Sequence, residues 1–128
     1  MRLDYTVPTT KSYAEAVAAV VDATAEHGFR VQFVHDVAGA IQERGFESQP
    51  VTIVEICNAK FASQVLARDV LIGLMLPCPV MVWEKDGAVS ISTMRPTLIG
   101  GFFPEAQVDE IAAEVESIIC AIVDAAAA

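Results

Sequence analysis

VTIVEICN, residues 51–58, contains the clearest strand signal of the chain and leads directly into a predicted helix. Its β-branched residues and its alternation predict a strand that ends at Cys57. Glu55 and Cys57 point to the same face of that strand, because side chains alternate along it. Asn58 is a favoured N-cap residue and predicts a helix from residue 59 to about residue 68. The stretch therefore places a carboxylate and a thiol at a strand end, immediately before a helix.

The chain before this stretch begins with a strand and a helix. Weak alternation predicts a short strand over residues 2–7, which Pro8 stops. Ser12 and Glu15 have the spacing of a capping box, so we expect a helix over residues 13–27.

A second strand and a short helix then lead to the central stretch. Alternation predicts a strand over residues 29–35. One face of it should carry four side chains, Phe29, Val31, Phe33 and His35. Asp36 suits the start of a short helix that Gly45 ends.

The clearest turn signal is Asp86-Gly87, which predicts a hairpin of strands 80–85 and 88–94. A two-residue turn pairs the apolar positions of one face, Val82 with Ile91 and Val80 with Thr93. Met81 and Trp83 then lie on the other face. Because both faces carry large apolar groups, the pattern indicates that both are covered.

The last part of the chain ends in a long helix. Residues 66–76 are an apolar run that Gly73 interrupts, and its pattern does not separate a helix end from a buried loop. Residues 98–103 read as an apolar loop, and Pro104 suits the first turn of the last helix. Its buried stripe has spacings of three and four: Val108, Ile111, Val115, Ile118 and Ile122. The alanine tail should fray.

The order of these elements is strand, helix, strand, short helix, strand, helix, hairpin and long helix. An antiparallel hairpin with helices available to cover one face predicts an α+β fold with a single antiparallel or mixed sheet, not a doubly wound parallel fold. The length of 128 residues fits one domain, residues 1–128.

The composition is unusually apolar. Hydrophobic residues make up 54% of the chain and the mean hydropathy is +0.47, whereas about 45–50% apolar is usual. This surplus suggests a partner surface, and we expect a homodimer. No apolar run reaches the roughly 20 residues that span a bilayer, and no signal peptide is visible, so we expect a cytoplasmic protein.

The charge balance argues against two classes of partner. Eight Lys and Arg residues against seventeen Asp and Glu residues give a net charge of -9. Nucleic acids and anionic membranes are bound through basic residues, so we expect neither as a partner. Three cysteines cannot all pair within one chain, which leaves reactive or metal-binding thiols as options.

Four segments together resemble a known family. They are His35-Asp36-Val37, Glu55-Ile56-Cys57-Asn58, Leu76-Pro77-Cys78 and Arg95-Pro96. The resemblance is to a bacterial and archaeal family, number three hundred and two in the domain-of-unknown-function series, and covers about residues 29–100. It implies a TATA-binding-protein-like topology, with helices on one side of the sheet, and a dimer, but no reaction. Members usually have proline where this chain has Ala59, which still permits a helix.

Cys57 is the first candidate of the site. A helix start stabilises a thiolate and lowers its pKa, whereas the nearby Glu55 carboxylate disfavours a second negative charge. Free cysteine is also often buried, so an inert core role competes equally with a reactive or ligand role.

Cys78 and His35 are the other candidates. Cys78 lies between two prolines, which restrict its backbone and suit a ligand, a nucleophile or a shaped buried loop. With His35 or Glu55, the two cysteines would make a three-point metal site, although no metal motif is present and we expect no metal. His35 is a general base or ligand, or more often a hydrogen-bonded core-edge histidine. The sequence identifies no cofactor.

We weigh three hypotheses of function. The first is a homodimeric cytosolic module that binds a small molecule in a cleft near Cys57 and Cys78, with His35, Glu55 and Asn58 as further ligand-binding candidates. The second is sulfur-transfer or redox chemistry in which Cys57 is the nucleophile and Cys78 its partner. The third is purely structural association. Six apolar side chains could be ordinary core, a dimer interface or the wall of a small pocket, and the high apolar content favours the interface: Trp83, Met81, Leu98, Ile99, Phe102 and Phe103.

Overall fold

Five antiparallel strands form one sheet in the order β1-β5-β4-β3-β2 in this computed structural model, which describes residues 2–128. The strands are β1 (Asp4–Thr9), β2 (Arg30–Asp36), β3 (Val51–Cys57), β4 (Cys78–Lys85) and β5 (Ala88–Met94). The predicted α+β class with a single antiparallel sheet is confirmed.

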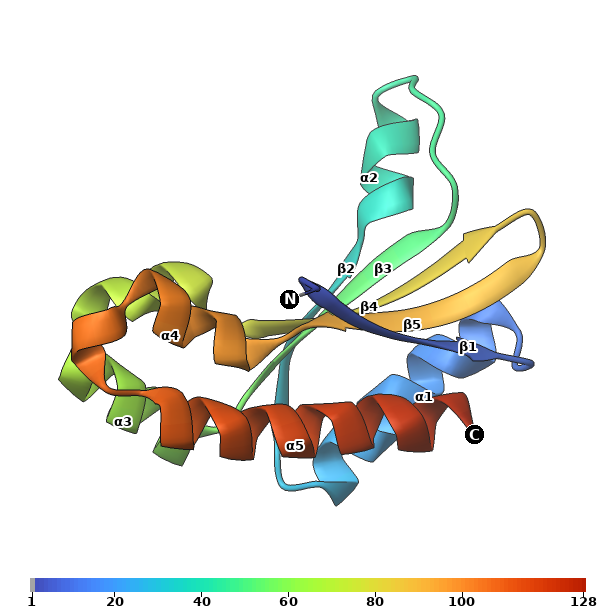
Figure 1. Ribbon diagram of the computed structural model, residues 1–128. Coiled ribbons are helices and arrows are strands. Elements are labelled where there is room, and N and C mark those ends of the chain that lie inside the picture. Colours follow the sequence, from blue (N-terminus) through green and yellow to red (C-terminus); the bar gives the residue numbers. More distant parts are fainter. Residues whose placement is uncertain (1) are drawn as a thin grey trace.

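Two long helices cover one face of the sheet, α1 (Tyr13–Glu26) and α5 (Asp109–Ala127) (Figure 1). Shorter helices lie beyond the end of the sheet where β3 ends and β4 begins. They are α3 (Ala59–Arg68), α4 (Ile99–Phe102) and the 3-10 helices η1 (Val70–Met75), η2 (Pro96–Leu98) and η3 (Pro104–Ala106). One further helix, α2 (Val37–Glu43), follows β2.

The main core fills the space between the sheet and the two long helices. Val54, Val80 and Ile91 of the sheet are fully buried against Val20 of α1 and Ile119 of α5. A second, smaller cluster lies under the short helices and contains Val65, Ile72, Ile99, Ala106 and Val108. The predicted hairpin register is confirmed, with Val82 opposite Ile91 and Val80 opposite Thr93.

Local capping signals predicted two helix starts correctly. The Ser12 hydroxyl accepts a hydrogen bond from the Glu15 amide, and the Glu15 carboxylate accepts one from the Ser12 amide. Asn58 caps α3 through the amides of Lys60 and Phe61. These pairs satisfy amides that a helix start leaves free.

The predicted side-chain pattern of β2 is wrong at a β-bulge. The register shifts between Val31 and Phe33, so the two ends of the strand present opposite faces. Phe29 is buried and Val31 packs on the main core, whereas Phe33 is 58% exposed on the other side of the sheet. His35 therefore shares a face with Phe33 and not with Phe29.

Pro8 does not stop the first strand, contrary to the prediction. β1 continues to Thr9, and Pro8 pairs with Ser90 of β5. β1 is an edge strand, where a residue without an amide hydrogen is tolerated.

The segment before the last helix also differs from the prediction. Residues 96–106 form short helical turns instead of a loop, and Pro104 begins a separate 3-10 turn. Gln107 has a left-handed backbone (φ 54°), which ends that turn, and α5 starts only at Asp109. The alanine tail is helical to Ala127, because buried Ala126 packs on the main core and its carbonyl accepts a hydrogen bond from Lys11 Nζ.

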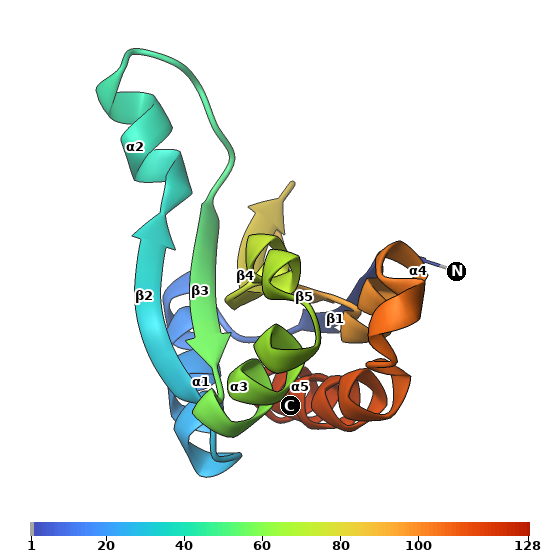
Figure 2. The same cartoon turned by 90° about the vertical axis from the view of Figure 1, so that its left-hand side faces the viewer.

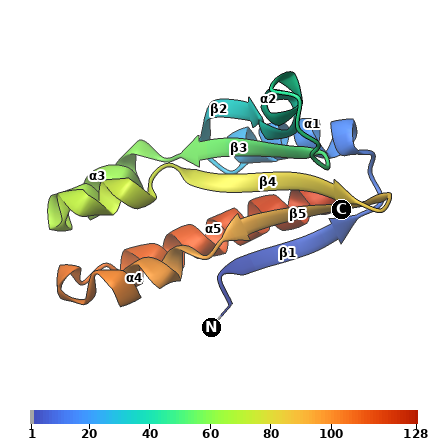
Figure 3. The ribbon, with the colours of Figure 1, turned by 90° about the horizontal axis from the view of Figure 1, so that it is seen from above.

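The other face of the sheet is covered by no helix among residues 2–128, so within the described chain only one face of the hairpin is covered by helices. We call this side the open face; Figure 3 shows its strands in front of α1 and α5. α2 and the loop after it, residues 37–50, rise on this same side (Figures 1 and 2) and are called the arm. Met81 and Trp83 are half-buried on the open face.

Candidate ligand pocket

An apolar pocket lies where β3 ends and β4 begins, between α3, α5 and the turns η2 and α4. The volume of this cavity is about 40 Å³. Its walls are Phe29, Phe61, Ala62, Val65, Leu76, Pro96, Ile99, Val108, Ile111, Ala112 and Val115, and its polar groups come from Cys57, Asn58 and Cys78. The pocket thus joins the main core to the second cluster.

Asn58 fixes the rim of this pocket. Its Oδ1 accepts hydrogen bonds from the amides of Lys60 at 3.0 Å and Phe61 at 3.3 Å. Its Nδ2 donates to the Gly28 carbonyl at 3.1 Å, which ties the start of α3 to the turn before β2. The Asn58 side chain is therefore engaged in structure, and Cys57 is held immediately before a fixed helix start.

Cys78 is the first residue of β4, pairs with Ile56 of β3 and packs on the main core. Burial raises the pKa of its thiol to about 11, and the neighbouring Cys57 contributes to that shift. An apolar environment disfavours the charged thiolate. Cys78 is therefore a neutral thiol at neutral pH, and it lines the same pocket as Cys57.

His35 and Glu55 do not join the cysteines. Both lie on the open face, where His35 Nε2 is 3.0 Å from Glu55 Oε2. The Phe33 ring lies against His35, with 4.5 Å between ring centroids. These residues line a separate groove between the sheet and the arm. Of the five predicted ligand-binding residues, His35 and Glu55 thus lie on the open face, whereas Cys57, Asn58 and Cys78 line the pocket.

The three-point metal arrangement is not formed. Within residues 2–128, no three His, Cys, Asp or Glu side chains come together in a way that could hold a metal ion. The physical reason is that Glu55 points to the open face, whereas Cys78 pairs with buried Ile56 and faces the core.

Several pocket residues were outside the predicted site. Phe29 and Phe61 stack with their ring centroids 6.2 Å apart, and Ile99 and Val108 close the pocket from the far end of the chain. The stripe of α5 predicted burial of Val108 and Val115, but no local signal could place them beside Cys78. Cys120 lies on α5 outside the pocket, and burial and Glu116 raise the pKa of its thiol.

No helix in the described part of the chain, residues 2–128, is long and apolar enough to cross a membrane.

Comparisons with known proteins agree with the sequence resemblance. The family model described as "Domain of unknown function DUF302" matches residues 5–126. Among solved structures, the chain is similar to an uncharacterized conserved DUF302 protein from Bacillus stearothermophilus. The two share 30% sequence identity and a TM-score of 0.93, over 98% of this chain and 99% of the other. A search of curated proteins found no match.

Proposed function

Because the chain belongs to the DUF302 family, whose description assigns no function, we propose a function from the pocket itself: a cytosolic, homodimeric module that binds a small apolar ligand beside Cys57 and Cys78. The observation that carries this proposal is an almost entirely apolar pocket that contains two neighbouring free thiols.

The walls of the pocket define the ligand class. They offer no charged side chain, and the polar atoms of Asn58 are already hydrogen-bonded. A charged or strongly polar ligand would lose its hydration without gaining partners, whereas an apolar group gains about 25 cal/mol per Å² of buried surface. A cavity that binds benzene measures about 150 Å³, so the volume of about 40 Å³ restricts the group to a slender alkyl chain.

Xenon, a small apolar atom, is a suitable first probe, and its binding is followed by NMR of the backbone amides. We expect dose-dependent shifts at Phe61, Val65 and Val115 in the wild-type protein. Ala62→Leu fills the pocket from its rim and should abolish these shifts, because leucine occupies the space of the probe.

Ala67→Leu is the matched control. Ala67 lies on the same helix but outside this pocket, so this variant should bind xenon as the wild-type protein does. Equal shifts in both variants, or none in the wild-type protein, would reject the ligand proposal.

Thiol chemistry is the second candidate, favoured by the proximity of Cys57 to Cys78. In that case Cys57 attacks an external disulfide as a thiolate and releases one thiol. Cys78 then displaces the second thiol, so the pair is oxidised by two electrons while the disulfide is reduced.

Alkylation kinetics separate the two candidates. Iodoacetamide should modify Cys57 and Cys78 more slowly than a free thiol at pH 7 if the pocket only binds a ligand. A Cys57 rate at least about tenfold above that of a free thiol would favour the thiol chemistry instead. Peptide mapping by mass spectrometry assigns the rates to each cysteine.

The homodimer rests on apolar surface. The chain is 54% hydrophobic, and large apolar side chains are exposed on the open face and the arm, with Phe46 at 70%, Leu3 at 62% and Phe33 at 58%. Exposed apolar clusters of this kind mark interaction sites. Light scattering should give about twice 13.7 kDa, and a monomer at millimolar concentration would reject the dimer.

A further inference from the structure

We propose that the open face of the sheet, together with the arm, is the surface on which two copies of this chain meet. The inference deepens the homodimer of the proposed function and rests on it. Five observations carry it: the apolar centre of the face, the shape of the arm, the hydrogen bonding of the polar groups, the charge, and the size.

The centre of the open face is apolar. Ile53 pairs with Met81 across β3 and β4, and both are half-buried although no helix covers them. A shallow groove beside them is lined by Leu3, Ile53, Pro79, Met81 and Met94, with Asp4, Ser92 and Thr93 at its border. Leu3 is 62% exposed. Methionine and aromatic side chains are enriched at the centres of protein interfaces.

The arm gives the face a wall. It stands on the open side, away from α1 and α5 (Figure 2), and the corner between arm and sheet is an apolar groove. Its apolar lining consists of Phe33, Val34, Val37, Ala40, Ile41, Phe46 and Ile53. Phe46 near the end of the arm is 70% exposed. In a twofold dimer, the arm of each copy would lie over the sheet of the other copy.

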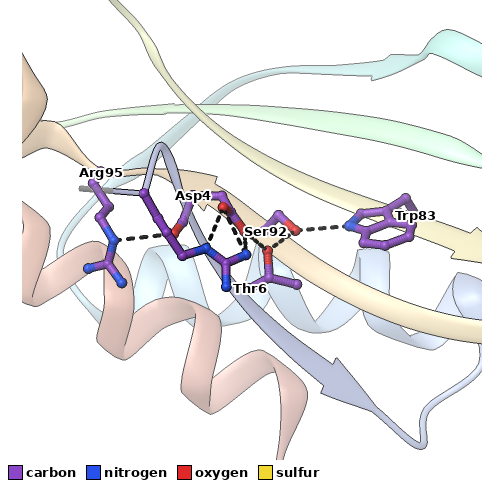
Figure 4. A network of polar contacts seen from close by, with 6 residues as sticks. Asp4, Thr6, Trp83, Ser92 and Arg95 are labelled. Atoms are coloured by element: carbon purple, nitrogen blue, oxygen red, sulfur yellow. Dashed lines mark hydrogen bonds and ion pairs between the residues drawn. The ribbon is translucent and has the colours of Figure 1, made fainter.

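The polar groups of the face are already hydrogen-bonded to one another (Figure 4). Trp83 Nε1 donates to Ser92 Oγ at 2.9 Å, and Ser92 Oγ lies 2.7 Å from Thr6 Oγ1. Thr6 donates to Asp4 at 2.5 Å, and Arg2 donates to the same carboxylate. A partner could cover these groups without leaving a donor or acceptor unpaired, which otherwise costs about 1–3 kcal/mol per group.

The charge of the face also permits self-association. The chain carries a net charge of -9, so most pairs of its surfaces repel. The strands place two carboxylates on the open face: Asp4 pairs with Arg2 at 3.2 Å, and Glu55 lies 3.0 Å from the His35 imidazole. The arm adds Glu43, Arg44 and Glu47. The surface thus carries few acidic groups for a chain with a net charge of -9, so two copies repel each other less here than over the rest of the chain.

The size of the surface matches a dimer. Strand spacings of about 4.8 Å and residue spacings of about 3.3 Å give a face of roughly 24 Å by 20 Å, or roughly 500 Å². A stable interface buries about 800 Å² on each partner, so the sheet alone is too small. The arm, residues 37–50, supplies the remaining area. Edge pairing is less suited, because Pro8 interrupts the amides of β1 and a bulge distorts β2.

Met81→Glu tests the inference, because it places a charge at the centre of the face in both copies. We expect the dissociation constant of the Met81→Glu dimer to be at least about 30-fold higher than that of the wild-type dimer. Substitutions of residues at the centre of an interface weaken binding by this much. Sedimentation equilibrium measures the constant, and far-UV circular dichroism verifies that the variant is folded.

Leu74→Glu is the matched control, since Leu74 is 83% exposed on η1, the other apolar surface of the molecule. This variant should dimerise as the wild-type protein does. If only Leu74→Glu dissociates, or if neither variant does, the open face is not the interface and this inference is wrong. The proposal that the wild-type protein is a homodimer would still stand. A monomeric wild-type protein would reject the dimer itself, and the xenon titration tests the ligand pocket separately.

Trp83 offers a test without substitution, because it is the single tryptophan of the chain and lies on the open face. Acrylamide quenching of its fluorescence should increase when the wild-type dimer is diluted through its dissociation. Unchanged quenching while the mass halves would show that the partner does not cover this face.

Discussion

Among single residues, Cys78 and Asn58 show how one side chain's surroundings set its role. Both line the pocket. The polar atoms of Asn58 form hydrogen bonds with three backbone groups, whereas Cys78 packs on the apolar core. With a pKa of about 11, about one Cys78 thiol in ten thousand is ionised at pH 7. Cys78 therefore contributes shape and polarisability to the pocket rather than charge.

The raised pKa of Cys78 predicts a loss of stability at alkaline pH. The unfolded thiol ionises near its ordinary pKa of 9.0, before the folded one at about 11. Between these values the unfolded state binds fewer protons, so the free energy of unfolding falls as pH rises. Two pKa units correspond to about 2–3 kcal/mol.

Urea unfolding at pH 8 and pH 11 checks this prediction. Cys78→Ala should be less stable than the wild-type protein at pH 8 but should lose about 2–3 kcal/mol less between the two values. Parallel pH profiles for the two proteins would mean that Cys78 does not carry this dependence.

At the scale of elements, the start of α3 positions the pocket. Asn58 both caps the helix and ties it to Gly28, so the rim depends on one side chain. The bulge in β2 has a different effect: it turns Phe33 and His35 toward the open face, away from the pocket. A cap and a bulge thus assign the predicted site residues to two different surfaces.

Two variants of Asn58 separate the cap from the tie. Asn58→Ala removes both and should lower the free energy of unfolding by about 1–2 kcal/mol. Asn58→Asp keeps the acceptor for the amides of Lys60 and Phe61 but cannot donate to Gly28, so its loss should be smaller. Urea denaturation measures both, and equal losses would assign the effect to the Gly28 hydrogen bond.

At the scale of the whole molecule, α5 connects the two hydrophobic clusters. Its Ile119 and Ile122 lie in the main core, and its Ile111 packs on both clusters. The pocket lies where the clusters meet, which is why its walls come from distant parts of the chain.

Ile119→Ala should destabilise the whole molecule by about 2–5 kcal/mol, because Ile119 is fully buried. Trp83 fluorescence and far-UV circular dichroism should report the same shifted urea midpoint, since α5 packs on both clusters. Ile118→Ala, at a half-buried position of the same helix, should cost less than half as much. Separate transitions by the two probes would show that the clusters unfold independently.

Much of the fold could be predicted because its signals are local. The capping box at Ser12, the Asn58 cap and the Asp86-Gly87 turn each depend on a few neighbouring residues. The pocket was harder to predict. The sequence predicts that Cys57 and Cys78 approach each other. The apolar walls of the pocket, however, include Ile99 and Val108, and no local pattern indicates that these residues lie near the cysteines.

The α+β class, the starts of α1, α2 and α3 and the hairpin register follow from the sequence alone, because hydrogen bonding and periodicity within a few residues encode them. Only the tertiary structure decided which face each site residue occupies. A strand alternates with a period of two, so the bulge in β2 sends His35 to the open face, where it meets Glu55. Cys78 faces the core, and the packing of α5 closes a pocket around it.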